Sequence, residues 1–369
     1  MPLDAFQSSQ SPFVPADQPE PQTVLSPLTS AAAFLVVTVS ADAAAADRAL
    51  ATACDIGSLV RAVGFREPSA SLSCIVGLGA DFWDRVRPTG ASRPAQLHPF
   101  RAVAGTRHDA PSTPGDLLFH IRANRPDLVF ELTRLLMDAL GGDVHVEDHV
   151  TGFRYFDSRD LLGFVDGTEN PTGRGAAGAA LISADQEPDF VGGSYVTVQK
   201  YVHDMAAWQA LSTEEQERVI GRTKLDDVEL DEDVMPTNSH VSLNTIVDED
   251  GTEHDILRDN MAFGDPAQGE MGTYYIAYAA DPSVTERMLE RMFIGDPPGN
   301  YDHILDVSTA RTGTQFFVPS LDLLESLPDQ FPTEGGAPAQ DAPSGTGVTP
   351  GTTTSTESLS IGSLRGIES

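Results

Sequence analysis

The chain has few of the residues on which several classes of protein depend. Only two of its 369 residues are cysteines, Cys54 and Cys74, and they are not spaced as CxxC. A disulfide framework and a zinc site built on thiolates are therefore excluded. One disulfide between the two thiols remains open, but two reduced thiols in an intracellular protein are the favoured interpretation.

Basic residues are also scarce, since 23 Lys and Arg stand against 55 Asp and Glu and give a formal net charge of −32. A nucleic-acid-binding surface needs clustered cations to neutralise phosphates, and an anionic membrane surface would repel this chain. Small cationic substrates or metal ions would be attracted. The favoured interpretation of the charge is that it keeps the protein soluble.

Long apolar stretches are missing as well. The longest, residues 31–39, is too short to span a bilayer, and the N-terminus lacks the basic segment and apolar run of a secretory signal. We therefore expect a soluble, cytoplasmic protein with no membrane contact.

Several common catalytic and nucleotide-binding motifs do not occur. The sequence contains no GxGxxG that opens a helix after a strand, no GxxxxGK[ST] and no GxSxG. None of its nine histidines has the spacing of a zinc-binding helix, and a lone histidine is more often a structural hydrogen-bonding residue than a ligand. Nucleotide binding and zinc-helix chemistry are therefore not supported.

The pattern of apolar residues predicts an α+β protein made of two related halves that meet near residue 150. Runs of β-branched and apolar residues predict strands, and apolar residues at helical spacing predict helices between them. The expected strands are residues 31–39, 72–78, 117–123, 194–202 and 273–278, and the expected helices are 43–63, 127–140, 213–221 and 283–293. A repeated strand–helix–strand order of this kind is typical of a ferredoxin-like fold with antiparallel sheets.

Composition divides the chain further. Residues 1–24 are polar and rich in Pro and Gln, which predicts a disordered tail, and residues 328–356 have the composition of a flexible linker. Between them we expect an N-terminal domain at 25–148 and a C-terminal domain at 149–327. Residues 357–369 regain spaced apolar side chains, which is typical of a short docking segment and which a random frayed end would seldom show: Leu359, Ile361, Leu364 and Ile367.

One stretch, GFVDGTENPTG at residues 163–173, carries an acid between two glycines after an apolar approach. Glycine permits backbone conformations that other residues avoid and lets the backbone come close to a bound group. We therefore expect the turn to fix the position of Asp166 and to bury it in part. The alternative is an ordinary Asp-Gly turn at the surface. A second stretch, ILRDNMAFG at residues 256–264, predicts a strand on which Arg258 and Asn260 share one face.

These two stretches belong to a series of five. GFVDGTENP is followed by GSYVTVQKYVHD, IGRTK, SHVSLN and ILRDNMAFG in that order. Together they resemble the dye-decolourising (DyP-type) haem peroxidases, and among these the bacterial B-type group, over roughly residues 25–325. The resemblance implies a pair of ferredoxin-like domains with haem b in the C-terminal half.

The resemblance also implies roles for particular residues. His240 would be the proximal ligand of the haem iron, and the acid behind it would be Asp302 or Asp306. The residues that act on peroxide would be Asp166, Arg258 and Asn260.

Two further positions match the cofactor-binding residues of the family. Arg222 would pair with a haem propionate, and Gly167 would lie beside the haem. The sequence supports no metal besides the haem iron.

The implied activity is reduction of hydrogen peroxide through an oxoferryl intermediate, followed by oxidation of dyes, phenolics or Mn(II). Such peroxidases form homo-oligomers, and the segment SLSIGSLRG is similar to the peptide by which some of them enter an encapsulin nanocompartment. The alternative is a protein of the same fold that handles haem or iron without turnover of peroxide. A haem-free cargo protein of the shell would leave His240 and Arg222 without a role.

Overall fold

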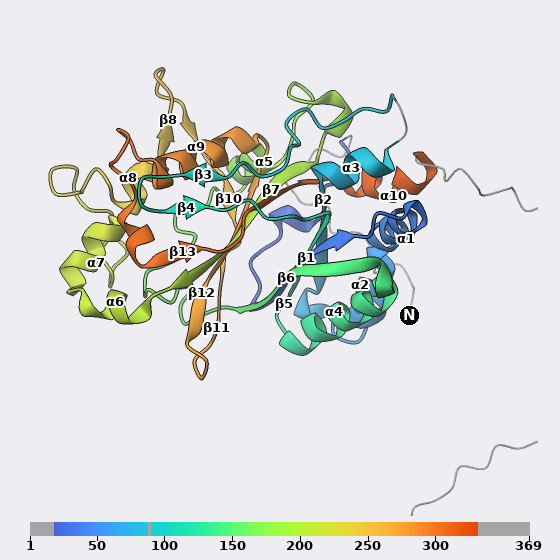
Figure 1. The fold of residues 1–369 in the computed structure, drawn as a ribbon, viewed down its shortest axis with the longest axis horizontal. Coiled ribbons are helices and arrows are strands. Elements are labelled where there is room, and N and C mark those ends of the chain that lie inside the picture. Colours follow the sequence, from blue (N-terminus) through green and yellow to red (C-terminus); the bar gives the residue numbers. More distant parts are fainter. Residues whose placement is uncertain (1–17, 88–89, 331–369) are drawn as a thin grey trace, which may run out of the picture. The chain divides into compact units, whose positions relative to one another are not determined.

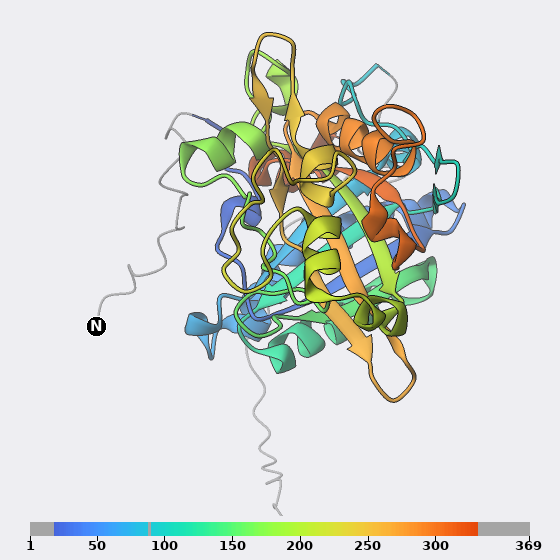
Figure 2. The ribbon, with the colours of Figure 1, turned by 90° about the vertical axis from the view of Figure 1, so that its left-hand side faces the viewer.

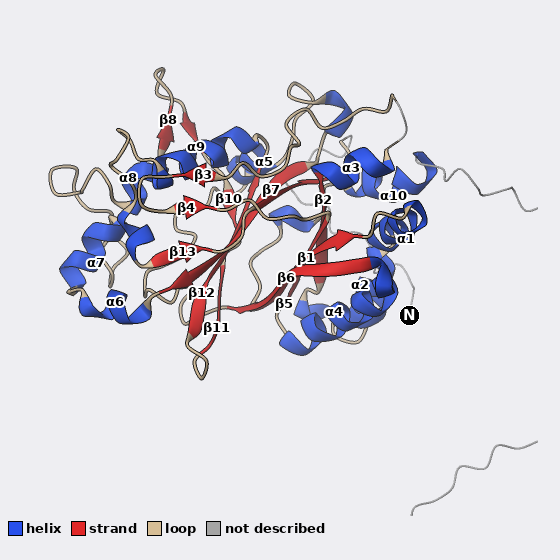
Figure 3. Ribbon diagram, in the orientation of Figure 1, coloured by secondary structure: helices blue, strands red, loops and turns tan. Residues whose placement is uncertain are grey.

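The computed structural model describes residues 18–87 and 90–330. The expected tail before residue 18, the linker beyond residue 330 and the proposed docking residues Leu359, Ile361 and Leu364 lie outside the described residues. Within them the fold is α+β, as the sequence predicts, with two ferredoxin-like halves (Figure 1, Figure 3).

The N-terminal half begins with β1 and ends with β6. Its main elements are β1 (Ala31–Val39), α1 (Ala43–Cys54), α2 (Ile56–Gly64), β2 (Ser73–Gly79), α3 (Ala80–Val86), β5 (Leu117–Ala123), α4 (Pro126–Leu140) and β6 (Val144–Phe153). The short strands β3 (Val103–Ala104) and β4 (Asp109–Ala110) form a separate hairpin.

The C-terminal half repeats this plan with longer excursions between the strands. Its strands are β7 (Ser194–His203), β8 (Ile246–Val247), β9 (Glu253–His254), β10 (Leu257–Arg258), β11 (Met261–Asp265), β12 (Glu270–Ala279), β13 (Ser308–Ala310) and β14 (Thr314–Val318). Its helices are α5 (Arg174–Ala180), α6 (Met205–Ala210), α7 (Thr213–Ile220), α8 (His240–Asn244), α9 (Pro282–Phe293) and α10 (Leu321–Gln330).

Each half has the strand order of a ferredoxin-like sheet. In the N-terminal half the order is β6-β1-β5-β2, and in the C-terminal half the equivalent order is β11-β12-β7-β14, with every pairing antiparallel. The two sheets also pair edge to edge, through β6 with β11 and through β2 with β14. The eight strands therefore form a closed circuit, in which the edge strands β6, β11, β2 and β14 are all paired.

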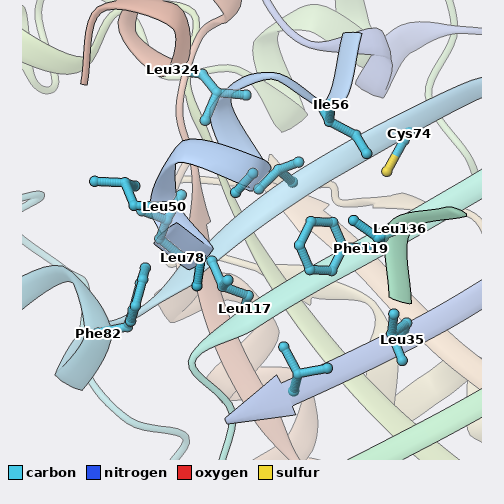
Figure 4. Packing of buried hydrophobic residues seen from close by; sticks show 14 of the residues in the cluster. Leu35, Leu50, Ile56, Cys74, Leu78, Phe82, Leu117, Phe119, Leu136 and Leu324 are labelled. Atoms are coloured by element: carbon cyan, nitrogen blue, oxygen red, sulfur yellow. The ribbon is translucent and has the colours of Figure 1, made fainter. Parts of the chain in front are cut away.

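Alternation along the strands divides the buried side chains between two cores. Along β1 the odd-numbered residues face the N-terminal helices, and Phe34 and its even-numbered neighbours face the space between the two sheets. Figure 4 shows the first of these cores, where Leu35, Phe119 and Leu136 meet. The N-terminal half is therefore closed by a continuous apolar core between its sheet and its helices.

Several expected boundaries differ from the structure, and three of these differences change an element or the extent of a tail or linker. Residues 43–63 form two helices rather than one, because Asp55 leaves helical geometry (ψ 11°) between α1 and α2. The polar tail ends earlier than residue 24, since Gln22 is buried and its side-chain amide donates to the carbonyls of Val76 and Pro319. Helix α10 continues through Pro328, so the linker does not begin there.

Two other observations concern the cysteines and the helices. Cys54 and Cys74 are both free thiols, and burial raises the pKa of each. Among the described residues no helix has the length and apolar character needed to cross a bilayer.

Candidate active site

The C-terminal half contains a cavity on one face of its sheet. The equivalent face of the N-terminal sheet is apolar and covered by helices. Including its open mouth, the cavity holds about 1460 Å³ of space free of protein atoms. Its floor is formed by residues that alternate along two strands, Tyr201 and His203 of β7 and Thr273 and Tyr275 of β12. Helices α7, α8 and α9 and the intervening loops lie over this part of the fold (Figure 2).

The sequence-predicted residues of the C-terminal half meet in this cavity. It is lined by Asp166, Gly167, Arg222, His240, Arg258 and Asn260. Apolar side chains from several elements line it as well: Leu162, Phe164, Ile220, Ile256, Met288, Leu289, Met292 and Ile304. Predominantly apolar walls with a few placed polar groups are typical of a cofactor or ligand site.

His240 is the first residue of α8, which begins after the N-cap Ser239. Its ring Nδ1 lies 2.7 Å from Oδ2 of Asp302, a carboxylate with no exposed surface. The side-chain amide of Asn244, one turn later, donates to the His240 carbonyl at 2.8 Å. Because Asp302 engages Nδ1, the ring presents Nε2 as the nitrogen for a ligand.

The structure also distinguishes between the two acids that the sequence left open behind His240. Asp306 contacts other groups: His108 Nε2 at 3.0 Å and the Tyr301 hydroxyl, which donates to it at 3.0 Å. Asp302 is therefore the acid that orients His240.

Asp166 lies in the glycine-rich turn, where its backbone N–H donates to the carbonyl of Ser158 at 2.8 Å. Its Oδ1 accepts a hydrogen bond from the side-chain amide of Asn260 at 3.2 Å. Burial raises the pKa of the carboxyl above its ordinary value, while Arg258 and Asn260 oppose that rise.

Glycine is required at two positions of this turn. Gly163 has φ +93°, and a Cβ there would lie 2.6 Å from Cε of Lys224. Gly167 has φ +83° and directly follows Asp166. These left-handed conformations explain why the acid is bracketed by glycines.

Arg258 and Asn260 both reach the cavity, as the alternation in the sequence predicts, but not on a continuous strand. β10 ends at Arg258 and β11 begins at Met261. The guanidinium of Arg258 makes no hydrogen bond or ion pair with any residue in 18–87 or 90–330, and its Nε is buried. A buried cationic donor without a protein partner is a group prepared to meet a ligand.

Arg222 also lines the cavity, but protein acids engage it. Its Nε donates to Asp227 at 2.9 Å, its Nη1 donates to Glu169 at 2.5 Å, and Glu229 lies 3.6 Å away. An incoming carboxylate would have to share the guanidinium with these acids or displace the exposed Glu169.

Sequence reasoning missed Asp160, which lines the same cavity. Its Oδ1 accepts from the backbone N–H of Phe164 at 3.0 Å, which closes the turn that carries Asp166. Burial and the nearby carboxylate of Asp166 raise the pKa of Asp160 to about 7. The Asp160–Asp166 spacing was visible in the sequence, but its significance depends on burial.

Asn170 was also missed as a functional residue, although it stands inside the glycine-rich stretch. Its side-chain amide donates to the carbonyl of Arg258 at 2.7 Å and accepts from the Arg258 N–H at 2.9 Å. This pair of hydrogen bonds joins the turn of Asp166 to the segment of Arg258 across 88 residues of sequence.

Comparisons with known proteins agree with this geometry. The family model described as Dyp-type peroxidase, N-terminal, matches residues 21–154, and that described as Dyp-type peroxidase, C-terminal, matches residues 157–323. The dye-decolorizing peroxidase of Mycolicibacterium paratuberculosis is 54% identical over 354 residues, which are 96% of this chain and 94% of that protein. That of Mycobacterium tuberculosis is 53% identical over 96% of this chain and 98% of its own length.

Two solved structures are similar throughout the fold. DyPB from Rhodococcus jostii RHA1 is 63% identical, with a TM-score of 0.81 over 83% of this chain and 97% of its own, and variants of it are known in complex with heme. The encapsulated DyP-type peroxidase from Mycobacterium smegmatis is 59% identical, with a TM-score of 0.80 over 83% of this chain and 98% of its own. This chain belongs to the Dyp-type peroxidase family and is a peroxidase.

Proposed function

We propose that the cavity holds haem b, with His240 as the axial ligand of the iron, and that the enzyme reduces hydrogen peroxide there. The observation that carries this proposal is the buried Asp302 behind Nδ1 of His240, in the same cavity as Arg258, whose guanidinium has no partner within residues 18–87 and 90–330. When bound, the haem supplies the iron at which peroxide is reduced and organic donors are oxidised.

The donor set suits iron that is already held by a porphyrin. A bare ion needs three or more protein ligands, and no group of three His, Cys, Asp or Glu able to hold one occurs in residues 18–87 and 90–330. A single imidazole backed by a carboxylate is sufficient for an axial haem ligand. The apolar walls and the size of the cavity suit a large, flat, apolar group with acidic substituents.

The protein's own contribution is to handle a proton and stabilise charge. Cleavage of the O–O bond requires that one oxygen lose a proton and the other regain it. Asp166 is the base, because Arg258 favours its ionised form and Asn260 holds its Oδ1 in place at 3.2 Å. Arg258, whose guanidinium has no hydrogen-bond partner among the described residues, would stabilise the negative charge that develops on the departing oxygen.

The reductants that we propose are dyes and phenolics, and also Mn(II), because a DypB variant has been solved in complex with manganese. Arg222 would bind a haem propionate through Nη1, the nitrogen now held by the exposed Glu169. Handling of haem without peroxide turnover would not need the Asp166–Asn260–Arg258 set.

We also propose that the enzyme is packaged in an encapsulin shell as a homo-oligomer, with residues 357–369 as the cargo-loading peptide. The support is the apolar spacing of Leu359, Ile361 and Leu364 and the encapsulated state of the Mycobacterium smegmatis relative. The proposed organisation keeps an N-terminal domain to about residue 148, a C-terminal domain after it and a linker before the peptide.

An absorption experiment tests the cofactor and the activity together. The haem-loaded protein should show a Soret band that shifts on addition of one equivalent of peroxide and returns on addition of a reducing dye. His240→Ala should lose the native Soret band while keeping the far-UV circular dichroism of the fold. A Soret band that ignores peroxide would favour haem handling, and an unchanged band in His240→Ala would refute the assignment of the ligand.

A further inference from the structure

We infer that Arg122, in the N-terminal half, is a positioning residue for peroxide reduction, acting through a buried ion pair with Asp259. This inference rests on the proposed roles of Arg258 and Asn260, the two neighbours of Asp259 in the sequence. Arg122 itself does not line the cavity: the residues that do so lie between positions 160 and 308.

The ion pair lies inside the space between the two sheets. Arg122 belongs to the face of β5 that looks away from the N-terminal helices, and its Nη1 lies 2.5 Å from Oδ2 of Asp259. Both residues are almost without exposed surface, at 1% for Arg122 and 3% for Asp259. A second guanidinium nitrogen, Nη2, donates to the carbonyl of Thr23, and the third, Nε, is buried with no hydrogen-bond partner among the described residues.

Two other charged groups act on Asp259, both less strongly than Arg122: Asp166 raises its pKa and Arg154 lowers it. His120 Nε2 lies 3.8 Å from Asp259 Oδ2, and burial keeps the pKa of His120 well below its ordinary value, so the imidazole is neutral. Its Nδ1 lies 2.8 Å from the hydroxyl of Tyr278. Among the described residues, Arg122 is therefore the charged cation in direct contact with Asp259.

Desolvation makes such a pair an inefficient source of stability, because apolar residues of the same volume often serve as well or better. A buried ion pair can instead fix the conformation of the segment that carries it. Here the segment is the two-residue gap between β10 and β11, where Asp259 stands.

Three anchors hold this gap. On the strand side, the Asp259 N–H donates to the carbonyl of Ile276 at 3.1 Å, and the Ile276 N–H donates to Oδ1 of Asn260 at 3.1 Å. Toward the glycine-rich turn, Asn170 holds both backbone groups of Arg258, and the side-chain amide of Asn260 donates to Asp166 Oδ1 at 3.2 Å. On the inner side, among the described residues, the charged side chain that anchors this gap is Arg122, through its contact with Asp259.

The inner anchor matters because the guanidinium of Arg258 has no side-chain partner among the described residues. Its direction is therefore set by its backbone and by packing, not by a hydrogen bond at its tip. A shift at Asp259 would move Arg258 and Asn260 together, and small displacements of positioned groups cost large factors in rate. Through this pair Arg122, which does not line the cavity itself, contributes to the site from the N-terminal half.

The test uses the haem-loaded enzyme and two variants of the pair. Asp259→Asn keeps the shape and removes the charge, and Arg122→Lys keeps the charge and loses the planar fork. The matched control is Asp116→Asn, which removes a mostly buried acid that pairs with Arg85 at 3.3 Å in the N-terminal half. Three quantities are measured: the melting temperature, the second-order rate constant with peroxide, and the KM for a reducing dye.

We expect Asp259→Asn to lower the peroxide rate constant at least tenfold, with the KM for the dye within twofold of wild type. Arg122→Lys should lie between Asp259→Asn and wild type. Hydrogen exchange of a peptide covering residues 256–263 should become faster in Asp259→Asn, also in the haem-free protein. Asp116→Asn should change the peroxide rate constant less than twofold whatever its melting temperature.

A double variant, Arg122→Met with Asp259→Leu, separates positioning from stability and serves if the single variants do not fold. It leaves no unpaired buried charge, so we expect it to recover stability but not the peroxide rate constant. A wild-type rate constant in Asp259→Asn or in the double variant would overturn the inference. Arg258→Ala and Asn260→Ala, run beside them, test the proposed function: wild-type rates in both would refute that function instead.

Discussion

Asp302 lies with its Oδ2 2.7 Å from Nδ1 of His240 and has no exposed surface of its own. Its other oxygen accepts from the backbone N–H of Ile304 at 2.9 Å, so the carboxylate is fixed on both sides. A fixed acceptor at Nδ1 determines which ring nitrogen remains for the iron and makes that nitrogen more basic.

The first prediction follows from this pair. Asp302→Asn should weaken haem retention or the rate with peroxide by about 10- to 100-fold, because the amide is a weaker acceptor and can present its NH2 to the ring. Haem titration and stopped-flow absorption would measure the two effects. Asp306→Asn is the control, since Asp306 contacts His108 and Tyr301 instead. Equal effects of the two changes would contradict the assignment of Asp302.

The second prediction concerns the proton carrier. Asp166→Ala should lower the rate constant with peroxide by about 10²- to 10⁴-fold, the range typical of a positioned acid–base group. Arg258→Ala should lower it by about 10²- to 10³-fold, the range typical of one donor that stabilises developing charge. Rapid mixing with peroxide measures this without any reductant. Asp157→Asn, an exposed acid in the approach to the same turn, should leave the rate unchanged. If neither Asp166→Ala nor Arg258→Ala slowed the reaction, the distal assignment would be wrong.

The third prediction is a pH dependence of stability. Because burial and Asp166 raise the pKa of Asp160 to about 7, the folded protein binds more protons at this site than the unfolded chain between about pH 4 and 7. The contribution of this group to stability is therefore present below pH 4 and is lost as the pH rises through 7. Each unit of pKa corresponds to about 1.4 kcal/mol.

Asp160→Asn removes this loss and keeps the acceptor for the Phe164 N–H. Solvent that enters the open cavity reduces the effect. We therefore expect the free energy of unfolding of the haem-free variant, minus that of wild type, to be about 2 kcal/mol larger at pH 8 than at pH 4. Urea unfolding at the two pH values measures it. A difference that does not change with pH would contradict the raised pKa.

A fourth prediction tests the core in Figure 4. Phe119 has no exposed surface and packs between the N-terminal sheet and its helices. Phe119→Ala should cost about 3–5 kcal/mol in the free energy of unfolding, through lost burial and the cavity left behind. Denaturant unfolding measures the loss. Phe130→Ala, at a side chain that is 69% exposed, should cost far less, and a similar cost for both would argue against this core.

The fifth prediction concerns the C-terminal peptide. A chain truncated after Thr356 should keep wild-type peroxidase activity, because the described fold ends with α10 well before that point, and should no longer be packaged by an encapsulin shell. Co-expression with the shell protein and sizing of the particles measure packaging. Replacing Leu359, Ile361 and Leu364 by Ser in the full chain should have the same effect if the apolar side chains are responsible. Packaging of the truncated chain would contradict the proposal.

The sequence by itself determined the fold class and the places of the five strands and four helices that it predicted, but β6 and β14 were not among those strands. The runs at β1, β5 and β7 are rich in β-branched and apolar residues, and the periodicity of α4 and α9 is helical, so local preference and burial pattern agree there. The order of the motifs also indicated Asp166, His240 and Arg258 as site residues, and the structure places all three in one cavity.

Tertiary structure decided what local patterns cannot express. The closure of two sheets through β6–β11 and β2–β14 depends on pairings between residues more than 100 positions apart, and no periodicity encodes them. The choice of Asp302 over Asp306 is likewise a matter of three-dimensional proximity. The pairing of Arg122 with Asp259 also depends on the tertiary structure. From the sequence alone, a single charged residue in a strand is predicted to be exposed, and only the packing of the second sheet shows that Arg122 is buried.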